Sequence, residues 1–106
     1  MPTLQEITET TKESDFQRLS SSSDFVFEFF NKFGIECWWN QKRFTNQSDS
    51  DKFAVIYRMK LIFLYYEEYE KCHWIKEKTR EFFYSGKKFD IDKNFEKEVK
   101  EKILGE

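Results

Sequence analysis

The stretch FAVIYRMKLIFLYY, residues 53–66, decides the fold of this 106-residue chain. Only Arg58 and Lys60 in it are charged, and its apolar residues form two stripes at helical spacing, at positions 55, 59, 62 and 66 and at positions 53, 57, 61, 64 and 65. Strict alternation is absent and β-branched residues are few, which disfavours a strand. A helix that is apolar around most of its circumference is a buried helix. The stretch therefore predicts a helix at the centre of the molecule.

This central helix is expected to run from Asp51 to Gly86, because serine and aspartate residues at 48–50 can supply the N-cap and Gly86 suits a left-handed C-terminal position. Unbroken, it would be a rod about 50 Å long, whereas a compact domain of this size is about 35 Å across. The helix is thus expected to bend, to project or to pack against a second chain, and its burial to end in the polar run at residues 67–71.

The composition sets limits on location and partners. The apolar core of the central stretch is about 14 residues, whereas a membrane span needs about 20, so no membrane segment is expected. The net charge is −2 with 36% charged residues, which gives no strong attraction to nucleic acid or anionic membranes. The aromatic fraction of 20% excludes global disorder. Two cysteines and the absence of a signal-peptide pattern at the N-terminus favour the cytoplasm.

Residues 1–22 are predicted to be a loosely docked N-terminal arm, and residues 23–106 a single helical domain. Thr3 and Glu6 match a capping box, with Leu4 and Ile7 as a weak apolar edge. The four serines at 20–23 have the composition of a flexible linker.

Two further helices flank the central one. Phe25, Phe29 and Phe33 are the apolar stripe of a helix over residues 24–33, which is expected to end at Gly34. A last helix is expected after a cap at Asp90 or Asp92, with an apolar stripe at positions 95, 99 and 103 and ion pairs at 96–100, 97–101 and 98–102. The chain is therefore predicted to be an all-α small helical bundle around one long central helix. The alternative is an α+β fold in which residues 35–44 and 53–66 pair as strands.

The pair Trp38-Trp39, followed by Lys42, Arg43 and Phe44, is the strongest candidate binding segment. Adjacent residues cannot share one helix face, so at least one indole is expected to point away from the core. Tryptophan and arginine are enriched at binding hot spots, and aromatics beside cations can also stack on bases. Packing of both indoles on a small core remains the competing interpretation. The candidate partner-binding residues are Trp38, Trp39, Lys42, Arg43, Phe44 and Trp74.

Other clusters point less clearly to chemistry. Cys72-His73 with Cys37 offers too few ligands for structural zinc, and a Cys37–His73 thiol nucleophile is a remote alternative. Glu70-x-x-His73 fits a di-iron spacing once, without the second copy such a site needs. A basic group at residues 76–88 is interrupted by glutamates and suits the negative end of a helix. No metal, cofactor or catalytic residue is predicted.

These patterns favour a non-enzymatic protein-binding module, meaning an adaptor, an inhibitor or a small subunit of a larger complex, that acts through an aromatic-rich surface. The expected partner is another protein or a second copy of the chain. The alternative is a nucleic-acid-binding protein, or a blocker of a nucleic-acid-processing enzyme, that uses Lys42, Arg43 and the two tryptophans.

Overall fold

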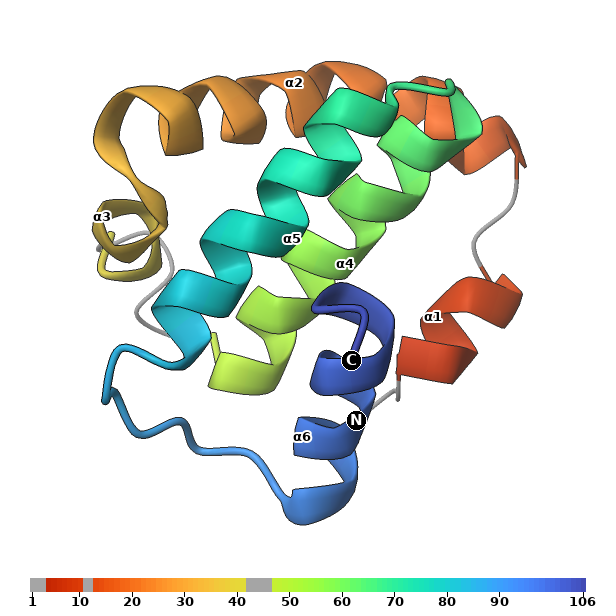
Figure 1. Ribbon diagram of the computed structural model, residues 1–106. Coiled ribbons are helices and arrows are strands. Elements are labelled where there is room, and N and C mark those ends of the chain that lie inside the picture. Colours follow the sequence, from red (N-terminus) through yellow and green to blue (C-terminus); the bar gives the residue numbers. More distant parts are fainter. Residues whose placement is uncertain (1–3, 11–12, 42–46) are drawn as a thin grey trace.

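In the computed structural model, the apolar stretch is the first arm of a helical hairpin. The structure describes residues 4–10, 13–41 and 47–106. Helix α4 spans Asp49–Tyr65 and helix α5 spans Tyr69–Phe83, and the two lie side by side at the centre (Figure 1). Every regular element in the described residues is helical, so the all-α prediction is confirmed. The alternative in which residues 53–66 form a strand is wrong, since α4 covers residues 53–65. The single helix expected over residues 51–86 is divided in two, because the chain turns back after Tyr65.

The turn between α4 and α5 has the conformation of a helix end that normally contains glycine, although no glycine is present in it. Glu67 has φ 58°. The amide of Glu68 donates to the carbonyl of Phe63 at 2.8 Å, and the amide of Glu67 donates to the carbonyl of Leu64 at 3.0 Å. These two bonds are the Schellman pattern, which satisfies carbonyls at the end of a helix and normally places glycine in the left-handed position.

Burial explains why the chain accepts this conformation. The molecule measures 34 × 30 × 28 Å, so an unbroken rod of about 50 Å would extend beyond it. Folding back places the buried face of α5, with Cys72 and Ile75, beside the buried face of α4, with Met59 and Phe63. Burial of apolar side chains contributes roughly 1.5–3 kcal/mol for each large one, whereas one left-handed residue costs about 1–2 kcal/mol.

Replacing Glu67 with glycine is therefore expected to stabilise the protein by up to about 1 kcal/mol, because glycine adopts positive φ without steric cost. The change is measured as a higher midpoint in urea unfolding. His73→Gly is the matched control, since His73 is exposed inside α5, where glycine costs about 0.5–1 kcal/mol. Equal destabilisation by both changes would contradict the left-handed turn.

Helix α2 spans Glu13–Phe33 and crosses over both helices of the hairpin (Figure 1). The serines at 20–23 lie within it, so the expected linker is wrong and the boundary between residues 22 and 23 falls inside a helix. The inward stripe runs through the serines: Leu19, Ser23, Val26 and Phe30 follow one another at helical spacing, and Ser23 and Phe30 are buried. Gly34, with φ 91°, ends α2 as predicted, and its amide donates to the carbonyl of Phe30 at 2.8 Å.

Helices α1 (Leu4–Thr10) and α6 (Lys93–Glu98) cover the hairpin on the side away from α3, which spans Ile35–Trp39 (Figure 1). The Glu98 carboxylate accepts hydrogen bonds from the amides of Leu4 at 2.7 Å and Gln5 at 3.2 Å, so it caps α1 from another part of the chain. Its expected pair partner Lys102 donates to the side chain of Gln5. Of the predicted ion pairs, 96–100 and 97–101 are present at 3.7 and 3.9 Å.

The last helical segment, η2 (Val99–Ile103), continues α6 as a π-helical turn. Two cations from the hairpin reach its end. The Lys60 ammonium donates to the carbonyls of Lys102 and Ile103 at 3.0 and 3.1 Å, and the Arg80 guanidinium donates to the carbonyl of Leu104 at 2.9 Å. Partial burial lowers the pKa of Lys60, and the nearby Lys76 lowers it further, while Cys72 opposes the shift.

Candidate partner-binding surface

Both indoles of the Trp38-Trp39 pair are buried. Trp38 is 0% exposed and Trp39 is 2% exposed, so the expectation that at least one points away from the core is wrong. The reason is that α3 lies between other elements. Trp38 packs edge-on against Phe30 of α2 at 5.1 Å between ring centroids, while Trp39 packs against Phe82 of α5 at 5.1 Å. Two neighbouring side chains that diverge can both be buried when a short helix has packing partners on two sides.

Trp39 is the centre of a larger aromatic cluster. Its ring lies 4.8 Å from Phe53 of α4 and 5.3 Å from Phe89, which belongs to the segment between α5 and α6. The buried Lys52 donates from its ammonium to the Trp39 carbonyl at 2.9 Å and lies 5.3 Å from the indole centroid. A cation at a helix C-terminus and over an aromatic face is favourable on both counts. These contacts make Trp39 part of the packed core.

The other residues that the sequence predicted to bind a partner are Lys42, Arg43, Phe44 and Trp74. Lys42, Arg43 and Phe44 lie outside the described residues. Trp74 is half-buried on α5, where its ring packs edge-on against Phe27 of α2 at 5.1 Å. It also lines a groove of about 660 Å³ between α5 and the end of α2, together with Phe33, Lys78 and Glu81. Of the predicted binding residues in the described part of the chain, Trp38 and Trp39 are buried and only Trp74 is partly exposed.

The exposed aromatic surface lies instead at the turn between α4 and α5. Leu64, Tyr65, Tyr66 and Tyr69, which we call the tyrosine turn, are exposed by 50, 42, 41 and 61% respectively. The Tyr65 and Tyr66 rings meet edge-on at 5.0 Å, and Phe16 of α2 lies 4.8 Å from Tyr65. Leu64, Tyr65 and Tyr66 were predicted to lie on the apolar stripes of an unbroken helix, whereas Tyr69 belongs to the polar run at residues 67–71, where burial was expected to end. That polar run is the signal in the sequence that marks the turn.

The tyrosine turn is fixed to α2 through a charged contact. The Lys71 ammonium lies 3.1 Å from the Glu68 carboxylate and 3.7 Å from that of Asp24 on α2, and it sits over the rings of Phe27 and Phe63 at 5.4 and 5.0 Å. Partial burial alone would lower the pKa of Lys71, but the carboxylates of Glu68 and then Asp24 outweigh it and raise the pKa. Lys71 therefore stays charged and holds the base of the turn in place.

A second exposed aromatic group lies on α2. Phe25 and Phe33 are more than half exposed, while Phe29 is half-buried and lies 4.9 Å from Phe33. Val26 and Phe30, each one position after a member of the expected stripe, are the residues that face the core. The helix is longer than predicted and its inward face is rotated relative to the expected stripe.

The other side-chain clusters singled out in the sequence make contacts within the fold. Cys72 is buried, and burial raises the pKa of its thiol, with Lys60 opposing the shift. Arg80 of the basic group bonds Leu104 and pairs with Glu77 at 3.1 Å. In the described residues no three histidine, cysteine or carboxylate side chains gather closely enough to hold a metal ion. No helix there combines the length and apolarity needed to cross a membrane.

The two thiols are expected to differ strongly in reactivity, because the thiolate is the reacting form and Cys72 is both buried and raised in pKa. Cys37, which is exposed, should be alkylated by iodoacetamide at least tenfold faster at neutral pH. Mass spectrometry of peptides over a time course measures both rates. Raising the pH should speed Cys72 labelling, and urea should abolish the difference. Equal rates in the native protein would contradict the burial of Cys72.

Comparison with known protein families, with curated proteins and with solved structures found no match to this chain.

Proposed function

We propose that the chain is a non-enzymatic protein-binding module, an adaptor, inhibitor or small subunit, that acts through the tyrosine turn. One observation carries the proposal: within six residues, four large apolar or aromatic side chains are exposed by 41–61%. Exposed apolar patches on small proteins mark contact sites. The proposed compartment is the cytoplasm, where an exposed thiol such as Cys37 stays reduced.

Tyrosine suits such a surface for a physical reason. Its ring supplies apolar contact area, its hydroxyl bonds a partner, and it has few rotatable bonds to immobilise. Truncating one tyrosine at the centre of an interface commonly costs about 2 kcal/mol or more in binding free energy, which is more than a tenfold loss of affinity. Three tyrosines around Leu64 are therefore a residue set suited to the centre of an interface.

The rigidity of the turn adds to its binding potential. The Glu67 and Glu68 amides are bonded to α4, and Lys71 connects the turn with Asp24 of α2. A surface that is already ordered loses less conformational entropy when it binds. The backbone that carries the tyrosines is thus already ordered before a partner arrives.

The chain bends into a hairpin, which is one of the three outcomes expected for the overlong helix, so helix length no longer argues for a second chain. A nucleic-acid binder that stacks bases on Trp38 and Trp39 needs exposed indoles, whereas both are buried. Nucleic-acid binding is therefore an outcome of the test below and not a second proposal.

The test is affinity purification from the native host with the double variant Tyr66→Ser/Tyr69→Ser beside the wild type. The control is Tyr84→Ser, because Tyr84 is also 53% exposed but lies at the far end of α5, where its hydroxyl donates to Glu106 at 2.7 Å. We expect a protein, or a second copy of the chain, that the wild type and Tyr84→Ser retain and the double variant loses by at least tenfold.

Two outcomes would overturn the proposal. One is a partner retained equally by all three proteins. The other is a chain that stays monomeric in light scattering and retains no protein. Partners released by nuclease treatment would transfer the proposal to the nucleic-acid alternative.

A further inference from the structure

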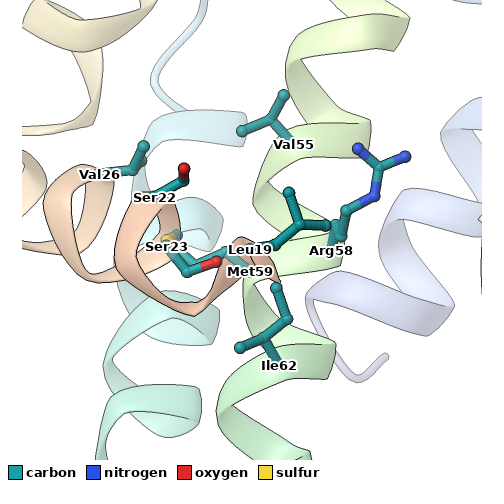
Figure 2. A pocket seen from close by; sticks show the side chains of 8 residues that line it. All are labelled: Leu19, Ser22, Ser23, Val26, Val55, Arg58, Met59 and Ile62. Carbon is teal, nitrogen blue, oxygen red and sulfur yellow. The ribbon is translucent and has the colours of Figure 1, made fainter. Parts of the chain in front are cut away.

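A small apolar cleft lies between α2 and α4. Its wall consists of Leu19 and Val26 from α2 and Val55, Met59 and Ile62 from α4 (Figure 2). Its volume is about 90 Å³. Small serines at positions 22 and 23 of α2 stand where larger side chains would fill the space between the two helices. The cleft thus follows from the serine run that the sequence suggested to be a linker.

Three polar side chains border this apolar space. Ser22 and Ser23 lie on the α2 side, and Arg58 lies on the α4 side at the edge of the cleft (Figure 2). Arg58 is half-buried, and Ser23 is 7% exposed. In the described parts of the chain, no carboxylate pairs with Arg58 and no group accepts its hydrogen bonds. A partly desolvated guanidinium without a counter-ion favours an anion from outside.

We propose that this cleft binds a small anionic amphiphile, namely a monocarboxylate with a short aliphatic chain. The chain fills the space among Val26, Val55 and Ile62, and at the edge of the cleft the carboxylate accepts hydrogen bonds from the Arg58 guanidinium. The guanidinium fork matches a carboxylate in geometry as well as in charge.

The size of the cleft decides between a small molecule and a protein segment. A helix is about 10 Å across with its side chains, so it cannot enter a space of about 90 Å³. An enclosed apolar cavity of about 150 Å³ holds benzene. A smaller cleft with an open mouth therefore suits an alkyl chain of a few methylenes. This site is independent of the tyrosine turn, and neither proposal depends on the other.

The test is titration of the ¹³C-methyl-labelled protein with butanoate, hexanoate and octanoate below their micelle concentrations. We expect saturable shifts of the Val26, Val55, Met59 and Ile62 methyl groups. The dissociation constant should fall about fourfold for each added methylene until the chain outgrows the cleft. Hexanol is the matched neutral ligand, and it should bind at least tenfold more weakly than hexanoate because it lacks the charge-assisted bonds.

Three variants locate the site. Arg58→Gln should weaken hexanoate at least tenfold and leave hexanol unchanged. Ser22→Leu, at an exposed position on the rim, should fill the cleft and abolish both. Lys32→Gln removes a cation from the part of α2 outside the cleft and should change neither.

Several results would overturn the proposal. They are the absence of saturable methyl shifts with any of the three carboxylates, equal affinity for hexanol and hexanoate, or an Arg58→Gln variant that binds hexanoate like the wild type. Methyl shifts that instead follow protein concentration without ligand would show that a second copy covers the cleft, and this too would overturn the small-molecule site.

Discussion

Replacing Trp39 with alanine is expected to destabilise the protein by about 3–5 kcal/mol, the usual loss for a buried aromatic residue. Trp39 is 2% exposed and its ring contacts aromatic side chains of α4, α5 and the segment between α5 and α6. Native domains are stable by about 5–15 kcal/mol in total, so this change takes a large share of the stability. Urea unfolding followed by far-UV circular dichroism measures it.

Trp74→Ala is the matched control, because it removes the same side chain from a half-buried position on α5. Its loss should be less than half that of Trp39→Ala, since fewer buried contacts disappear. If the two losses are equal, or if Trp74→Ala costs more, Trp39 does not hold the position in the core that the structure gives it.

Replacing Leu4 with alanine is expected to cost about 2–4 kcal/mol, because Leu4 is 0% exposed and its removal leaves a cavity. Its side chain belongs to the same core as Val99 and Ile103, and its amide is bonded to Glu98. This prediction addresses the N-terminal arm directly, because a loosely docked segment would contribute little to global stability.

Glu9→Ala serves as the comparison for the arm, since Glu9 is exposed on the same helix and accepts only from Gln5 at 3.1 Å within the described residues. It should shift the unfolding midpoint only slightly. A Leu4→Ala protein as stable as Glu9→Ala would instead support the interpretation of residues 1–22 as a loosely docked arm.

Local signals in the sequence predicted the ends of several helices correctly. Ser48 caps α4 by accepting from the Asp51 amide at 3.2 Å, and Asp92 caps α6 by accepting from the Phe95 amide at 2.7 Å. Gly34 ends α2 with positive φ. These features depend on a few neighbouring residues, so a local pattern is sufficient to find them.

The errors arose where packing between distant elements outweighs local preference. Serine has a lower helix propensity than alanine or leucine, yet Leu19 and Ser23 continue a stripe of α2 that packs against α4. Glutamate is a poor residue for the left-handed position, yet Glu67 occupies it because the hairpin buries both arms. Neither effect can be read from neighbouring residues alone, since each depends on contacts with a different helix.

The candidate site was missed for the same reason. Whether Trp38 and Trp39 are exposed depends on where α3 lies relative to α2 and α5, which their spacing does not specify. Leu64, Tyr65 and Tyr66 of the tyrosine turn were assigned to the apolar stripes because the apolar run continues as far as Tyr66 without interruption. Its exposure follows only from the reversal of the chain at Glu67.

Because of where its three tryptophans lie, the intrinsic fluorescence of the protein reports whether the chain is folded. Trp38 and Trp39 are shielded from water by the core, and Trp74 is partly shielded under α2. Native fluorescence should therefore be shifted to the blue and move to the red when the chain opens. A ligand at the tyrosine turn or in the cleft between α2 and α4 leaves Trp39 untouched, so unfolding can be followed in the presence of either without a dye.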